Sequence, residues 1–277
     1  MDTPHETIAR RVAALFAPMP EVVAVALEGS RGAGGLGGDA GSDIDVGVYT
    51  RGEIALPARR AVVEAAGGAS VLDLGMTFWG PGDEWVDAAT GIHVDVVYFD
   101  AAWMADQVDR VLVRHEAQLG YTTCFWHTIR GCVALEDGEG WLAGLKARAA
   151  ASYPDELRTA IVAFNRAAMR GHLPSLAGQV ARAAARADLV SVNHRLAALL
   201  ACYFDVVFAV NLVPHPGEKL LVEAAGRLCA TLPEAMAEDV AELLESAATD
   251  LGGLPGRVER LLDRLDAVLA AEGLAGG

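Results

Sequence analysis

Hydrophobic and polar positions follow two different periods along the chain, and the period changes near residue 100. Before that point, apolar runs and strict alternation predict strands, because side chains on a strand point alternately to opposite faces. A helix is predicted after Thr3, since Thr3 and Glu6 can form a capping box, and a second helix is predicted at 57–67. The predicted strands span 22–27, 42–49, 71–79 and 92–99, with a short strand around Trp85-Val86.

Beyond residue 100 the apolar positions recur about every 3.6 residues, which predicts helices and no further strands. The fold class is therefore predicted to be α+β, with a small mixed β-sheet in a domain over 1–110 and an all-α helical bundle domain over 111–277. The apolar run Leu196 to Val213 contains Asp205 and Asn211, so we expect a buried bundle helix there and no membrane span. The predicted helices span 101–118, 121–135, 139–151, 155–170, 175–187, 189–212, 219–230, 233–248 and 256–271.

The charge of the chain indicates which kinds of molecule the protein binds. Its formal net charge is −15 at pH 7. Proteins that bind nucleic acid usually carry a basic face, so nucleic acid is disfavoured, and a cationic small molecule suits this protein better. The N-terminus lacks an apolar signal segment and the four cysteines form no C-x-x-C pair, which together predict a cytoplasmic protein. The sequence predicts no particular oligomeric state.

The glycine-dense segment between the first two predicted strands carries the candidate chemistry. It opens with Gly29-Ser30-Arg31 and leads into the alternating stretch Ser42 to Tyr49. The isoleucine and valines of that stretch point into a core, and Asp43 and Asp45 share the opposite face, with Cα atoms roughly 6.5–7 Å apart. Two carboxylates at this spacing beside a glycine turn suit the binding of Mg²⁺ against phosphates.

A third carboxylate is predicted to join this pair. Asp95 lies in the middle of the strand at 92–99, where a buried and unpaired carboxylate would be costly. Alternation places His93 on the same face as Asp95, where it could orient a carboxylate, contact substrate or simply sit at a strand edge. Two divalent ions about 4 Å apart need more than two carboxylates, so Asp95 is the natural third metal ligand.

The Gly-Ser turn, the Gly-rich loop and the Ser-Asp-Ile-Asp strand resemble the signature of nucleotidyltransferases of the DNA polymerase beta superfamily. The resemblance covers residues 20–100 and is strongest to the small-molecule branch, which includes the aminoglycoside and lincosamide nucleotidyltransferases. The segment Gly35 to Gly41 makes the loop longer than the family pattern, which bears on the loop conformation and not on the carboxylates. The resemblance implies a polymerase-beta-like domain followed by a helical domain, with the active site in the cleft between them.

The implied reaction is Mg²⁺-dependent transfer of a nucleoside monophosphate, AMP from ATP, to a hydroxyl of a small molecule. The resemblance implies that Asp43 and Asp45 bridge two Mg²⁺ ions and that Asp95 holds the catalytic ion. The Ser30 hydroxyl and nearby backbone N–H groups, including that of Gly29, would bind the β- and γ-phosphates.

Positive charge on the triphosphate could come from Arg31 and from Lys219. Lys219 is one of only two lysines in the chain, and the resemblance implies a helical-domain lysine on the triphosphate. The residue that accepts the proton of the acceptor stays open between Asp95 and an acidic residue of the helical half. Open too are the roles of three polar residues near the start of the long apolar helix, Arg186, Asp188 and His194.

Several functions are consistent with these residues. The resemblance and the acidic charge favour a cationic acceptor such as an aminoglycoside-like antibiotic, and hence a role in antibiotic resistance. A second hypothesis is transfer of AMP to a protein, as in nucleotidyltransferase antitoxins, which are usually shorter. A third is a non-catalytic nucleotide-binding protein on the same fold. Addition of nucleotides to a polynucleotide end is disfavoured by the net charge of −15.

Overall fold

The computed structural model describes residues 3–29, 32, 42–78 and 80–275. It is an α+β protein with a six-stranded mixed sheet and a helical part, which confirms the predicted fold class. The chain forms two compact units. The first comprises residues 1–109 and 125–151, and the second comprises residues 110–124 and 152–277.

One mixed sheet forms the centre of the first unit. Its strands, in chain order, are β1 (Val22–Leu27), β2 (Ile44–Thr50), β3 (Ala69–Met76), β4 (Gly82–Asp87), β5 (His93–Asp100) and β6 (Val133–Glu136). They are arranged in the order β3-β4-β5-β2-β1-β6. Strands β2 and β5 are parallel, and the other neighbouring pairs are antiparallel.

Two helices, α1 (Pro4–Phe16) and α2 (Leu56–Ala65), cover one face of the sheet. The predicted capping box begins α1: the Thr3 hydroxyl accepts the Glu6 N–H, and the Glu6 carboxylate accepts the Thr3 N–H. Alternate residues of each strand enter the core between sheet and helices. In β2 these are Ile44, Val46 and Val48, as the sequence predicts, and none of the three is more than 1% exposed.

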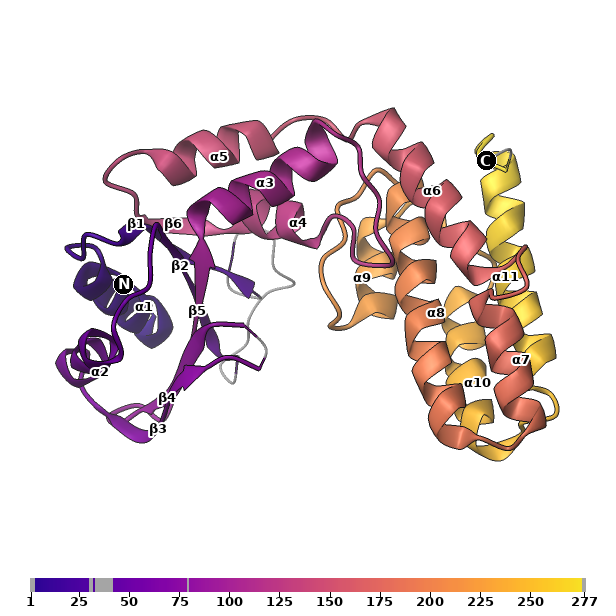
Figure 1. Cartoon of the computed structure of the whole chain (residues 1–277), viewed down its shortest axis with the longest axis horizontal. Coiled ribbons are helices and arrows are strands. Elements are labelled where there is room, and N and C mark those ends of the chain that lie inside the picture. The colour runs from indigo at the N-terminus through magenta and orange to yellow at the C-terminus, as the bar shows by residue number, and fades with distance from the viewer. Residues whose placement is uncertain (1–2, 30–31, 33–41, 79, 276–277) are drawn as a thin grey trace. The chain divides into compact units, whose positions relative to one another are not determined.

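The opposite face of the sheet is covered near the carboxyl ends of β2 and β5. Helices α3 (Ala101–Leu112), α4 (Cys124–Gly131) and α5 (Trp141–Ala149) lie together, away from α1 and α2 (Figure 1). Aromatic rings join them to the sheet, since Tyr49 contacts Phe99 and Trp141, and Phe99 contacts Trp103 and Phe125. This cluster lies several residues along the strands from Asp45 and Asp95.

Strand β6 corrects two predictions. The predicted helix at 121–135 ends as α4 at Gly131, and the next residues form a strand that pairs with β1, so the expectation of no strand beyond residue 100 is wrong. A strand of four residues is too short to show alternation inside a helical stretch, and its pairing edge on β1 lies far away in the sequence. Residues 125–151, which include β6, belong to the first compact unit together with residues 1–109.

The second unit is helical. Its helices are α6 (Asp155–Met169), α7 (Leu176–Ala185), α8 (Leu189–Val210), α9 (Leu221–Leu228), α10 (Met236–Thr249) and α11 (Leu254–Ala271). The long apolar helix α8 packs against α6, α7, α9 and α10. By length and composition α8 could cross a membrane, but 61% of its most apolar window is buried inside the protein, as in the core helix of a helical bundle.

Candidate active site

Asp45 and Asp95 lie directly beside each other in the sheet. They are register partners on the parallel strands β2 and β5. Because neighbouring strands run about 4.8 Å apart and partner residues point to the same face, the two carboxylates share one face at this spacing. That face is the one opposite the core formed with α1 and α2, and both residues are partly exposed. The structure therefore brings together two of the three carboxylates that the sequence singles out.

Gly29, two residues after the end of β1, lies against the same carboxylate. Gly29 has φ of +59°, and a Cβ atom at this position would lie 1.9 Å from Oδ2 of Asp45. Only glycine therefore fits, both because of its backbone conformation and because of the space that Asp45 occupies. The Glu28 N–H also donates to the carbonyl oxygen of Asp45 at 2.9 Å. These contacts hold the start of the turn against Asp45.

Asp45 and Asp95 belong to a row of acidic residues that crosses four strands, β3, β4, β5 and β2, and ends at the residue that follows β1. Asp73 on β3 is the partner of Glu84 on β4, and Glu84 is the partner of Asp95. On the other side, Leu27 pairs with Val46, which places Glu28 opposite Asp45. Like charges directly opposite each other destabilise a sheet, so a face of this kind is suited to bind positive charge. We call these five residues the carboxylate row: Asp73, Glu84, Asp95, Asp45 and Glu28.

Glu28 differs from the rest of the row because its carboxyl group is enclosed. It accepts a hydrogen bond from the Tyr49 hydroxyl, and it lies against Gly47, where a Cβ atom would be 2.0 Å from Oε1 of Glu28. Burial raises the pKa of Glu28 to about 7; the hydrogen bond from Tyr49 opposes this shift, and the charge of Asp45 adds to it. Glu28 can therefore share the site with Asp45 while carrying less than a full negative charge at neutral pH.

The remaining predicted site residues lie in different places. Asp43 is exposed and precedes β2 by one residue. His93 is on the same face as Asp95, and its Nδ1 is 3.8 Å from Oε1 of Glu84. Ser30 and Arg31 lie outside the described residues, so the predicted phosphate contacts of this turn stay predictions.

Lys219 lies in the second unit, exposed in the turn before α9, and its role also stays a prediction. Three further residues left open by the sequence belong to that unit. Asp188 caps α8, accepting hydrogen bonds from the backbone N–H and the hydroxyl of Ser191. Arg186 is the C-cap residue that follows α7, and His194 is exposed on α8.

Within the part of the chain that the structure describes, no three His, Cys, Asp or Glu side chains are arranged as a metal-binding group. Mg²⁺ in phosphate-transferring sites commonly takes one or two protein carboxylates and completes its coordination with water and substrate phosphates. Asp45 and Asp95 meet that smaller requirement. The donor set, made of carboxylate oxygens, is also the kind that Mg²⁺ prefers.

Sequence reasoning missed Glu28, Glu84 and Asp73. Glu28 directly precedes the glycine turn, and a carboxylate at the end of an apolar strand was a usable signal. Glu84 and Asp73 join the row only through the pairing of β3, β4 and β5, which the sequence does not show.

The chain matches no protein-family model and no curated protein. Among solved structures, it is similar to a nucleotidyltransferase-like protein from Exiguobacterium sibiricum. That similarity has a TM-score of 0.44 and 14% sequence identity, and it covers 98% of this chain and 76% of that chain.

Proposed function

We propose that this protein is a Mg²⁺-dependent nucleotidyltransferase that transfers a nucleoside monophosphate, AMP from ATP, to a hydroxyl of a small cationic molecule. One observation carries the proposal. Two carboxylates, Asp45 and Asp95, are register partners on adjacent parallel strands, and Gly29, just after β1, lies against Asp45. The resemblance of the Gly-Ser turn and the Ser-Asp-Ile-Asp strand to the signature of nucleotidyltransferases supports the same reaction.

In this reaction the acceptor hydroxyl oxygen bonds to the α-phosphorus while the bond from that phosphorus to the bridging oxygen of pyrophosphate breaks. Pyrophosphate leaves with the bonding electron pair, and the hydroxyl proton passes to a base. Asp45 and Asp95, with Asp43, would hold Mg²⁺, which supplies neutralisation of the charge that builds on the phosphate oxygens. The turn at Gly29 would let the backbone N–H groups approach the triphosphate.

The carboxylate row supports a cationic acceptor. Glu84 and Asp73 extend the acidic face from Asp95 toward the edge of the sheet, and both are exposed. Metal ions at Asp45 and Asp95 would leave these two carboxylates available for ammonium groups. The net charge of −15 favours the approach of such a molecule and disfavours a polynucleotide.

The direct test is incubation of the full chain with labelled ATP, Mg²⁺ and a panel of hydroxylated polyamines and aminoglycosides. The readouts are pyrophosphate release and label on the acceptor. Asp45→Asn and Asp95→Asn should each lower transfer by more than about a hundredfold, because a metal site supplies several kcal/mol of transition-state stabilisation. The matched control is Glu64→Gln, an exposed carboxylate on α2, which covers the other face of the sheet.

Three outcomes would contradict the proposal. Full activity of Asp45→Asn or Asp95→Asn would remove that residue from the metal site. Binding of ATP without Mg²⁺ dependence and without pyrophosphate release would instead indicate a non-catalytic nucleotide-binding protein. Label found on a co-purifying protein, and on no small acceptor, would indicate protein AMP transfer.

A further inference from the structure

A pocket of about 480 Å³ lies on the other face of the sheet, at the carboxyl ends of β2 and β5. It is lined by the loop after β2, by α2, and by the connection between β3 and β4. Thr50, at the end of β2, lines it and lies five residues along the strand from Asp45. At about 3.3 Å per residue, this is roughly 16 Å. The pocket is therefore separate from the carboxylate row.

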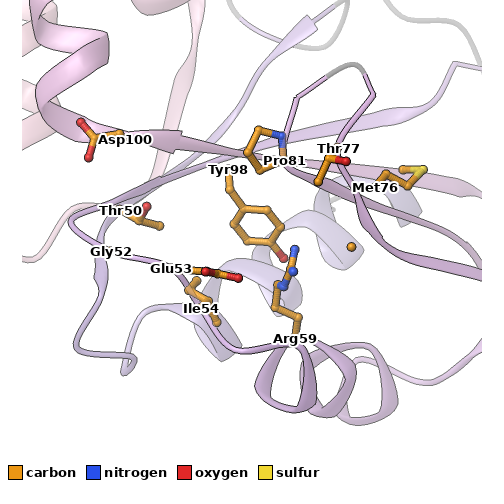
Figure 2. A pocket seen from close by; sticks show the side chains of 11 residues that line it. Thr50, Gly52, Glu53, Ile54, Arg59, Met76, Thr77, Pro81, Tyr98 and Asp100 are labelled. Atoms are coloured by element: carbon orange, nitrogen blue, oxygen red, sulfur yellow. The ribbon is translucent and has the colours of Figure 1, made fainter.

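Arg59 of α2 is the main polar feature of this pocket. It extends from the helix toward the ring of Tyr98, with the guanidinium carbon 4.9 Å from the ring centroid (Figure 2). Only 7% of its surface is exposed. Its Nη1 donates to Oδ1 of Asp83 at 3.2 Å, and Asp83 in turn accepts the Tyr98 hydroxyl at 2.6 Å and the Gly75 N–H at 2.8 Å. The guanidinium is thus held in place by buried partners.

A buried donor of this guanidinium has no partner among the described residues. Nε of Arg59 is buried and has no hydrogen-bond acceptor among the described residues. A buried donor without a partner costs about 1–3 kcal/mol, more when the group is charged. A ligand oxygen that reaches this nitrogen from the pocket would remove that cost, and a carboxylate matches the planar fork of a guanidinium best.

Glu53 offers the complementary charge in the same pocket. Its side chain lies between Thr50 and Arg59 in Figure 2 and is exposed. Within the described part of the chain it forms no ion pair, neither with Arg59 nor with the neighbouring Arg51, which pairs with Glu139. An unpaired carboxylate and an uncommitted guanidinium donor therefore line one pocket without meeting, which leaves room for a ligand that contacts both.

The balance of charge and apolar surface defines the ligand class. Glu53 and Asp100 line the pocket with Arg59, whose charge is already offset by Asp83. A simple anion such as phosphate would meet an excess of negative charge, whereas a molecule with one carboxylate and one ammonium group would not. Between these groups the walls are largely apolar, formed by Ile54, Met76, Pro81 and the ring of Tyr98.

We propose that this pocket binds a small zwitterion with an apolar body, the chemistry of an apolar amino acid. Its carboxylate bonds to Arg59, its ammonium group lies at Glu53, and its side chain packs on Tyr98 and Met76. The site is independent of the proposed transfer reaction.

Calorimetry of the full chain with leucine, methionine and phenylalanine tests the proposal. At least one of the three should bind saturably at one site per chain. Two truncated probes dissect the contacts: isopentylamine lacks the carboxylate of leucine, and isocaproate lacks its ammonium group. Both should bind at least about tenfold more weakly than leucine, because each loses one charge-assisted hydrogen bond.

Two substitutions locate the site. Glu53→Gln and Arg59→Lys should each weaken binding at least about tenfold, the second because lysine cannot reproduce the guanidinium fork. Glu53 is exposed, so Glu53→Gln tests the site even if Arg59→Lys destabilises the fold. Matched controls are Arg60→Lys and Glu64→Gln, exposed neighbours on α2, which should leave binding unchanged. Absence of binding of all three amino acids at millimolar concentration, or binding unaffected by Glu53→Gln, would overturn the proposal.

Discussion

Gly29 lies so close to Asp45, a candidate metal ligand, that no side chain fits at this position. A Cβ atom there would lie 1.9 Å from Oδ2 of Asp45 and 2.6 Å from its Cγ. Gly29→Ala must therefore push the Asp45 carboxylate away from its position. We expect transfer to fall by about tenfold or more, since small displacements of catalytic groups can cost about a hundredfold. Pyrophosphate release at saturating ATP and Mg²⁺ is the measurement.

The strain of the left-handed backbone has to be separated from the displacement of Asp45. Gly91, in the turn before β5, has φ of +73°, and a Cβ atom there would meet nothing within 4 Å. Backbone strain should cost both Gly91→Ala and Gly29→Ala about 1–2 kcal/mol of stability. Only Gly91→Ala should keep its transfer activity. Equal activity of the two variants would show that the position of Asp45 does not matter for transfer.

At the scale of elements, a buried carboxylate ties the loop before α4 to two helices of the second unit. Asp205 of α8 is 1% exposed and accepts the backbone N–H and the hydroxyl of Thr122 and the side-chain amide of Asn165. Burial raises the pKa of Asp205 to about 6, although these hydrogen bonds oppose the shift. The folded protein thus holds a proton on Asp205 at pH values where the unfolded chain has lost it.

The sign of the pH dependence follows from this difference. Because the folded pKa is higher than the unfolded value of 3.8, the free energy of unfolding should fall as pH rises from about 4 through about 6. The full effect is about 3 kcal/mol at 1.36 kcal/mol per pKa unit. Asp205→Asn should remove this component, as measured by urea unfolding across that pH range.

A control variant tests whether removing any carboxylate would change the pH dependence in the same way. Asp155→Asn, an exposed residue in the first turn of α6, should keep the pH dependence of the unaltered protein. If Asp205→Asn kept it as well, the buried carboxylate would not be the titrating group.

Elements also show where sequence reasoning succeeds. Alternation in β2 was enough to place Ile44, Val46 and Val48 in the core and Asp45 on the opposite face. The position of Asp95 among apolar residues marked it as a candidate site residue, and its strand β5 pairs with the strand of Asp45, β2. Helices with strong periodicity, such as α8, were found with ends accurate to a few residues.

What the sequence could not show depends on contacts between distant segments. Strand β6 forms because it pairs with the edge of β1. Its four residues are too few to show the alternation that would predict a strand. Glu84 and Asp73 enter the carboxylate row through strand register, which a single sequence leaves undetermined. The pocket at Arg59 is likewise assembled from segments that are separate in the chain.

At the scale of the whole molecule, the net charge of −15 and the carboxylate row predict two separable responses to cations. Salt at physiological ionic strength screens exposed charges beyond about 8 Å and so reduces general self-repulsion. Mg²⁺ should do this and in addition bind at Asp45 and Asp95. At equal ionic strength, MgCl₂ should therefore stabilise the protein more than NaCl does.

The excess stabilisation by Mg²⁺ should be about 1.4 kcal/mol when the ion is present at about ten times its dissociation constant. Asp95→Asn should lose this excess and keep the response to NaCl, because one charge in a net of −15 hardly alters general screening. Without Mg²⁺ the same variant should be as stable as the unaltered protein or more stable, since like charges opposite each other in a sheet are destabilising. Urea unfolding in matched NaCl and MgCl₂ solutions measures all three quantities. An excess that survives in Asp95→Asn would place the bound Mg²⁺ elsewhere.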